Sequence, residues 1–309
     1  MSGSFDTRHE GAINDAQFDY YGRQLATCSQ DGHIKIFLTK EDDQMQQVAN
    51  LQHHQGSVLA LSWSHPKFGS LLASCGVDRK VLVWKEMSSN SWNVVYEYDN
   101  HEGPINCIAW GPWEYDLTLL AGSLDGSVSV ISRTSEDRWE AMKFTAHEGG
   151  VYAVSWAPAT SLSLLESEES YLVKRFVSGG ADNLVKVWTW ADEHYDCTPL
   201  DLHTRCVRDV AWCPSLGMAR DMFASCSEDA TVAIWTNSSD SGKWKSKCVL
   251  KLKYPIWRVS WSVAGNVLAV SAYDNITRLL KEAPDETWEV VSTINENGQQ
   301  SNEDHIQLG

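Results

Sequence analysis

Short runs of alternating apolar and polar residues recur along the chain, and each run ends at an aromatic residue. Successive aromatic ends are 45, 47, 46, 56 and 49 residues apart. The alternation predicts a β-strand with one buried face, and a period of this length indicates one structural unit copied six times. The aromatic ends are Phe18, Trp63, Trp110, Trp156, Trp212 and Trp261.

Polar landmarks occupy fixed places in each repeat. A His opens each of the first five repeats, and an Asp begins a tight turn after the second strand. Asp, Gly and Asn in these turns suit left-handed backbone. The third strand ends six residues after the Asp, at Phe37, Trp84, Ile131, Trp188, Trp235 or Leu280. Weaker fourth strands are predicted near residues 48–51, 92–96, 139–144, 199–202, 247–252 and 288–293.

Four strands in each of six repeats predict the fold. A period near 45 residues with His, Asp and Trp at fixed offsets is typical of the WD-repeat β-propeller, in which each repeat forms one blade. We therefore expect an all-β, six-bladed propeller over residues 1–294, followed at residues 295–309 by a polar, disordered tail.

Composition narrows the class of partner. The chain has 309 residues, with 41 acidic and 25 basic side chains and a formal net charge of −16. Because no stripe of Lys and Arg could neutralise a phosphate backbone, we expect no direct binding of nucleic acid. With no signal peptide, no long apolar run and no CxxC pair among its eight cysteines, we expect a protein of the cytosol or nucleus with free thiols.

The repeated His and Asp residues are interpreted as scaffold. A buried His that donates to the turn Asp, with a Ser or Thr on the second strand and a Trp on the third, leaves no buried polar group unpaired. The expected network comprises His9 and Asp31; His54, Ser74, Asp78 and Trp84; His101 and Asp125; His147, Ser178, Asp182 and Trp188; and His203, Ser225, Asp229 and Trp235.

Signals for catalysis are weak. Two near-matches to HExxH, at residues 101–105 and 147–151, have an apolar fifth residue, and no phosphate-binding glycine loop or GxSxG motif occurs. We expect no enzymatic activity, no metal and no cofactor.

Repeat 4 contains an insertion. It runs from Ala157 to Tyr171, and its core at residues 161–170 consists mainly of Ser, Leu and Glu. This composition suits a mobile surface loop or a phosphorylation target.

The sequence also bears on whether the ring of blades closes. Only eight residues precede His9, and repeat 6 supplies its own fourth strand, so no spare strand remains to interlock the ends. We expect an open ring with apolar faces exposed on repeats 1 and 6, which would mark a binding site for a partner's blade; the alternative is a ring that contracts and closes. The expected seam residues are Ile13, Phe18, Leu25, Ile34, Ile36, Trp257, Val259, Leu268, Val270 and Leu279.

Five stretches resemble one WD-repeat family. Residues 15–22, 25–29, 65–69, 174–188 and 207–217 are similar to the Sec-thirteen type, the small subunit of the outer COPII coat that is shared with the Y-shaped nuclear pore subcomplex. A sister nuclear-pore propeller shares the first two stretches, and residues 174–188 favour the first assignment. Leu279-Leu280 departs from the expected Leu-Trp ending.

The resemblance implies a non-enzymatic scaffold. Its partners would be a large outer-coat subunit of COPII or a nucleoporin of the Y subcomplex, either of which would insert a seventh blade. The chain would be peripheral to the membrane through the coat, on the cytoplasmic face of the endoplasmic reticulum, on COPII vesicles and at the nuclear pore, with no homo-oligomer of its own. An alternative is a closed adaptor that reads a peptide on its top face, marked by aromatic and Arg residues around the channel.

Overall fold

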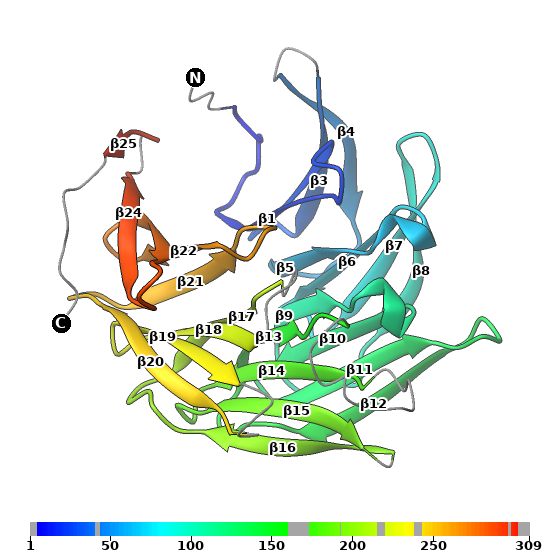
Figure 1. Cartoon of the computed structure of the whole chain (residues 1–309). Helices are drawn as coiled ribbons and strands as arrows, with labels where there is room; N and C mark the ends of the chain where they lie inside the picture. The colour runs from blue at the N-terminus through cyan, green and yellow to red at the C-terminus, as the bar shows by residue number, and fades with distance from the viewer. Residues whose placement is uncertain are drawn as a thin grey trace. The chain divides into compact units, whose positions relative to one another are not determined.

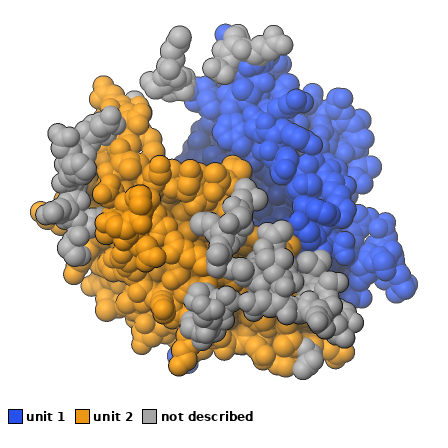
Figure 2. Space-filling model, in the orientation of Figure 1, with its two compact units in different colours: residues 1, 3–151 blue, residues 2, 152–309 orange. Residues whose placement is uncertain are grey.

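The chain forms a series of antiparallel sheets that follow one another along the sequence (Figure 1). The structure is a computed structural model and describes residues 5–40, 44–159, 173–191, 193–214, 220–237, 243–295 and 298–301. The inserted segment at residues 161–170 lies outside the described residues. The chain divides into two compact units, residues 1 and 3–151 and residues 2 and 152–309 (Figure 2).

Unit 1 contains blades 1 to 3. Within each blade the strands pair in sequence order, so every connection is a hairpin. Blade 1 comprises β1 (Ile13–Phe18), β2 (Gln24–Ser29), β3 (His33–Thr39) and β4 (Met45–Gln52). Blade 2 comprises β5 (Val58–Trp63), a 3-10 turn η1 (Pro66–Phe68), β6 (Leu71–Gly76), β7 (Val81–Ser88) and β8 (Ser91–Tyr98). Blade 3 comprises β9 (Ile105–Trp110), η2 (Trp113–Tyr115), β10 (Thr118–Ser123), β11 (Ser127–Arg133) and β12 (Trp139–Thr145).

Unit 2 contains blades 4 to 6. Blade 4 comprises β13 (Val151–Trp156), whose first residue belongs to unit 1, β14 (Arg175–Gly180), β15 (Val185–Ala191) and β16 (His194–Leu200). Blade 5 comprises β17 (Val207–Trp212), β18 (Asp221–Ser227), β19 (Thr231–Asn237) and β20 (Lys245–Lys251). Blade 6 comprises β21 (Ile256–Trp261), β22 (Val267–Ala272), β23 (Thr277–Glu282), β24 (Trp288–Ile294) and β25 (Gln300–Ser301).

The prediction of an all-β fold built from six WD-repeat blades is confirmed. Two details differ from expectation. The fourth strand of blade 4 is β16, which begins at His194 and ends at Leu200 instead of covering residues 199–202. Residues 300 and 301 form a fifth strand on blade 6, where Ile294 pairs with Gln300, so this part of the expected disordered tail is ordered against β24.

Apolar contacts join neighbouring blades inside each unit. Side chains alternate between the two faces of a strand, so within a unit the leading face of a blade points to the blade before it and the trailing face to the blade after it. In unit 1, Ile34 and Ile36 of blade 1 pack with Val58 and Leu61 of blade 2 in one buried cluster. In unit 2, the core cluster between blades 5 and 6 is built in the same way.

An N-terminal segment covers part of the leading face of blade 1. Phe5 packs edge-on against Phe37 of β3, with ring centroids 5.2 Å apart. The Lys35 ammonium is buried and donates to the backbone carbonyls of Thr7, at 3.2 Å, and Arg8. Among the described residues, the backbone of Thr7 and Arg8 thus supplies the acceptors for this buried cation.

Candidate functional site: the scaffold network and the free blade faces

The His and Asp residues of blade 2 form a closed hydrogen-bond network. His54 Nδ1 lies 2.9 Å from Asp78 Oδ2, and its Nε2 lies 2.7 Å from the Ser74 hydroxyl. Trp84 donates its indole N–H to the same hydroxyl at 2.9 Å. The His and Trp rings are buried, so the network fixes the turn to the sheet and fills every polar position.

Blades 1 and 5 repeat this arrangement with small changes. In blade 5, His203 lies 3.2 Å from Asp229 and 2.7 Å from Ser225, which also accepts from Trp235 at 2.8 Å. In blade 1, His9 lies 2.9 Å from both Asp31 and Thr27. The second-strand hydroxyl, expected from a Ser or Thr, comes in blade 1 from Thr27, which was not named among the expected network residues.

Blade 3 takes its hydroxyl from a different strand. His101 lies 3.0 Å from Asp125, but its Nε2 contacts Ser129 of β11 at 2.9 Å. The second strand has Ala121 at the usual Ser position, and Ala121 pairs with Ser129 across the β10–β11 ladder. The hydroxyl that Ala121 lacks is therefore supplied by the residue that lies opposite it on β11.

Blade 4 keeps the Ser–Trp contact of the network, and blade 6 replaces the His–Asp contact by an Arg–Asp pair. In blade 4, Trp188 donates to Ser178 at 2.8 Å, and His147 is buried. In blade 6, which has no opening His, Arg278 donates to Asp274 at 2.7 Å. An i,i+4 Arg–Asp pair in blade 6 thus holds the turn that His and Asp hold elsewhere, and sequence reasoning did not foresee it.

The protonation states of the network residues fit a structural role. Burial lowers the pKa of His101 and His203 despite the nearby Asp125 and Asp229, so both rings are neutral near pH 7. Burial opposes ionisation of Asp31, but hydrogen bonds from the His33 backbone N–H, His9 and the Glu10 N–H outweigh it and hold its pKa at about 2. In the described part of the chain no group of three or more His, Cys, Asp or Glu side chains is arranged to hold a metal ion.

We call the first strand of each blade its inner strand and the fourth its outer strand. The residue that opens the inner strand is exposed in blade 1 and buried in the other blades. Ile13 opens β1 and is 47% exposed, whereas the residues that open the other five inner strands are fully buried. Those residues are Val58, Ile105, Val151, Val207 and Ile256.

Backbone register shows that these positions are equivalent. Ile13 pairs with Ser29, Val58 with Gly76 and Val207 with Ser227, and each of these first pairs is followed by a β-bulge. Ile105 and Ile256 begin their ladders with the same irregularity.

The buried equivalents pack on the second strand of the preceding blade. A Cβ placed on Gly179 would lie 2.6 Å from a methyl group of Val207, and one placed on Gly122 would lie 2.7 Å from a methyl group of Val151. Phe18, at the end of β1, is 54% exposed, whereas Trp212 at the end of β17 is buried. Ile13 and Phe18 therefore form an exposed leading face.

The trailing side of blade 6 is likewise more open than that of blade 5. Asp209 of β17 accepts the Val259 backbone N–H at 3.0 Å, as Asp15 of β1 accepts the Leu61 N–H at 3.0 Å. The position equivalent to Asp209 in blade 6 is Arg258, which is exposed, as is Ser260. Leu279 of β23 is half-buried.

Six expected seam residues are buried instead of exposed: Leu25, Ile34, Ile36, Val259, Leu268 and Val270. Ile34 and Ile36 face blade 2, whereas Val259, Leu268 and Val270 face blade 5. For these five residues the apolar alternation was correct, but each strand has two apolar faces, and the expectation assigned the wrong one to the seam. Leu25 pairs with Phe18 and Phe37, so it lies on the leading face of blade 1. Ile13, Phe18 and Trp257 are exposed.

The sequence also has clear relatives. The family described as WD domain, G-beta repeat matches residues 3–37, 45–85, 92–132, 139–189 and 197–236. The chain is 49% identical over 301 residues to "Protein SEC13 homolog" of Homo sapiens, covering 94% of this chain and 92% of that protein. It is 58% identical over 297 residues to "Protein transport protein sec13" of Neurospora crassa, covering 93% and 96%. For the Pyricularia oryzae protein of the same name, the identity is 52% over 290 residues, covering 91% and 99%.

Proposed function

Because the chain belongs to the Sec13 group of the WD-repeat family, we propose that it is a non-enzymatic structural subunit of a protein-transport coat. In this role it stiffens a large scaffold partner, the outer-cage subunit of the COPII coat, which carries cargo from the endoplasmic reticulum to the Golgi. A nucleoporin of the nuclear pore Y subcomplex is a second partner of the same kind. The protein then lies on the cytoplasmic face of the endoplasmic reticulum, on COPII vesicles and at the pore.

The exposure of Ile13 is the observation that carries this proposal. Every equivalent side chain is sealed beneath the second strand of a preceding blade, and Ile13 has the same apolar character but is half uncovered. An apolar residue at this place suits a blade supplied by another chain. Such a blade would pack on Ile13 and Phe18 of blade 1 and on the trailing face of blade 6, at Arg258, Ser260 and Leu279. Strand addition and apolar packing together bury the area of a permanent complex.

Affinity purification with matched variants tests the proposal. The tagged chain is isolated from its own cells, and quantitative mass spectrometry measures partner stoichiometry. We expect near one-to-one recovery of a large coat scaffold or nucleoporin, and Ile13→Asp should abolish it, because a charge buried without a pair costs several kcal/mol. Val95→Asp is the control, since Val95 is an exposed apolar residue on the outer strand β8. Recovery of the partner with Ile13→Asp at the wild-type level would refute the proposed contact.

One observation favours the alternative of a peptide-reading adaptor. The second residues of three successive inner strands are Tyr152, Arg208 and Trp257, and the Arg208 guanidinium lies 4.6 Å and 4.7 Å from the two ring centroids. However, Arg208 also donates to Glu228 at 2.7 Å, so both its faces and its Nε are already engaged. Arg208→Ala with intact coat binding but lost recovery of smaller partners would support the adaptor.

A further inference from the structure

A strip of exposed aromatic rings crosses the three blades of unit 1. It is built on the connections between the first and second strands, outside the hydrophobic cores. Neighbouring ring centroids lie 5.2 Å apart for Tyr21 and Tyr20, 4.9 Å for Tyr20 and His65, and 6.0 Å for His65 and Trp113. We call these four residues the aromatic strip.

Three of the four rings of the strip are open to solvent, and His65 is half-buried. Tyr20 is 67% exposed and Tyr21 is 63% exposed, and Trp113 is also exposed. Contiguous exposed aromatic surface marks an interaction site, because Tyr and Trp supply large contact area and a polar group together. The scaffold network and the leading face of blade 1 account for none of these four side chains.

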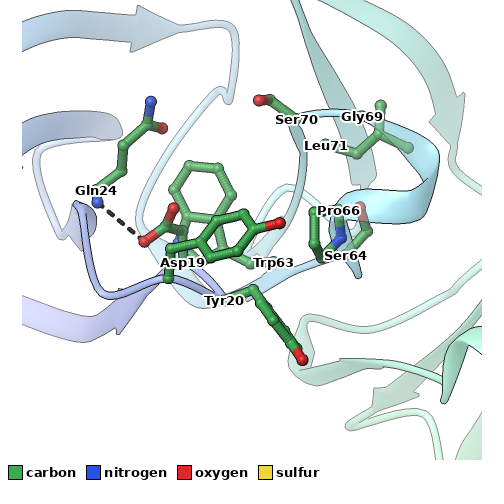
Figure 3. A pocket seen from close by; sticks show the side chains of 10 residues that line it. Asp19, Tyr20, Gln24, Trp63, Ser64, Pro66, Gly69, Ser70 and Leu71 are labelled. Carbon is green, nitrogen blue, oxygen red and sulfur yellow. Dashed lines mark hydrogen bonds between the residues drawn. The ribbon is translucent and has the colours of Figure 1, made fainter.

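A pocket lies beside Tyr20 (Figure 3). It has a volume of about 140 Å³, and the ring of Trp63, Pro66 and Leu71 supply apolar walls. Gln24, Ser64 and Ser70 add neutral polar groups. The strip therefore continues into an apolar recess with a polar margin.

Three charged groups beside the pocket and the strip already have partners. Asp19, the single carboxylate that lines the pocket, accepts from the backbone N–H groups of Arg23 at 2.6 Å and Gln24 at 3.0 Å. The Lys67 ammonium lies 4.6 Å from the Trp113 ring centroid, and the Arg23 guanidinium lies 5.8 Å from that of Tyr21. An uncharged ligand rich in apolar surface and hydrogen-bond acceptors is the best complement to this surface.

We propose that the aromatic strip binds a proline-rich segment of a partner protein in the polyproline II conformation. Such a segment is uncharged, packs prolyl rings between aromatic side chains, and exposes backbone carbonyls that have no internal partners. The hydroxyls of Tyr20 and Tyr21 donate to those carbonyls. At a rise of about 3.1 Å per residue, two residues of the segment cover each step between neighbouring rings. The pocket beside Tyr20 receives one prolyl ring.

Fluorescence polarisation with the full-length chain and fluorescein-labelled decaproline tests the proposal. We expect saturable binding, and Tyr20→Ala or Trp113→Ala should weaken it about tenfold, the loss typical of one aromatic anchor. Tyr20→Phe should weaken it less, because it removes only the hydroxyl. Tyr273→Ala is the matched control, because Tyr273 is 66% exposed but belongs to blade 6, and it should leave binding unchanged.

Three results would overturn the proposal. They are no saturable binding at millimolar peptide, equal binding of a Gly-Ser decapeptide, and equal weakening by Tyr20→Ala and Tyr273→Ala. Since all altered side chains are exposed, a thermal melt of each variant should match that of the wild type. The test is independent of the proposed coat contact, because Ile13→Asp should bind decaproline normally.

Discussion

The Tyr98 hydroxyl lies 2.8 Å from the Ser129 hydroxyl, and both residues are buried. Ser129 also contacts Nε2 of His101 at 2.9 Å. One hydroxyl on β11 thus joins the last residue of blade 2 to the opening His of blade 3. Two buried polar groups depend on it, so the position should be sensitive to substitution.

Ser129→Ala should destabilise the protein by about 1–3 kcal/mol, because it leaves the Tyr98 hydroxyl and the His101 nitrogen without this partner. Chemical denaturation measures the free energy of unfolding. Ala121→Ser should restore part of this loss, because Ala121 lies opposite Ser129 at the position that Ser74 has in blade 2. No recovery with that second change would show that the hydroxyl must come from β11.

Stability should fall in acid in two stages. The pKa values of His101 and His203 are lowered by burial from 6.5, so the unfolded chain takes up these protons first as the pH falls. The contribution of the two neutral rings to the free energy of unfolding is complete above about pH 6.5 and declines below it. The pKa of Asp31 is lowered from 3.8 to about 2, so its contribution is lost between these values.

Denaturation measured from pH 7.5 to pH 2 tests this dependence. His203→Gln should be less stable than the wild type at pH 7.5 and should lose less stability between pH 7 and pH 5.5. The exposed His194 provides the control, and His194→Gln should keep the wild-type profile. A flat wild-type profile down to pH 5.5 would contradict the role given to the buried rings.

A buried ion pair in unit 2 should show strong coupling. Arg175 of β14 donates to Asp221 of β18 at 2.8 Å, and within the described residues Arg175 Nε, Arg175 Nη2 and Asp221 Oδ1 have no hydrogen-bond partner. Removing one member leaves a buried charge, so Arg175→Leu or Asp221→Leu should each cost about 3–5 kcal/mol.

The double variant Arg175→Leu/Asp221→Leu should recover most of that loss, because it removes both charges. A double-mutant cycle on the unfolding free energy measures the coupling. Arg138→Ala is the control, since Arg138 is exposed and pairs only loosely with Glu136 at 3.6 Å. Additive single effects would mean that the two charges act independently.

Two glycines with similar backbone should respond differently to alanine. Gly126 has φ +84°, and its Cβ would lie 2.3 Å from the backbone oxygen of His147. Gly22 has φ +66°, with nothing within 4 Å of its Cβ. Gly22→Ala should cost about 1–2 kcal/mol from the left-handed conformation alone, and Gly126→Ala should cost more. Equal losses in denaturation would show that the backbone near His147 moves freely.

Periodicity in the sequence was enough to place the blades, because each one repeats the same strand lengths and turn chemistry. It could not decide which apolar face of a strand points to which neighbour. Ile34 and Val259 were assigned to the seam for this reason, although they face blades 2 and 5. The alternation has a period of two residues, and only the packed structure shows which face is covered.

The sequence also did not show that residues at other positions fill the expected roles in blades 3 and 6. Ser129 lies on a different strand from the Ser residues of the other blades, and Arg278 replaces a His that would lie more than twenty residues earlier. Residues 300–301 had too little apolar character to predict a strand, since β25 is held by backbone pairing with β24.

The contacts of residues 5–8 with blade 1 affect how the protein can be shortened. A truncation that starts at His9 would keep every strand, so from the strand boundaries it would be judged harmless. It would also strip the carbonyl acceptors from the buried Lys35 ammonium and uncover one edge of Phe37. Shortening the N-terminus would thus act as a core mutation, and affinity tags are better separated from Phe5 by a linker than substituted for the first eight residues.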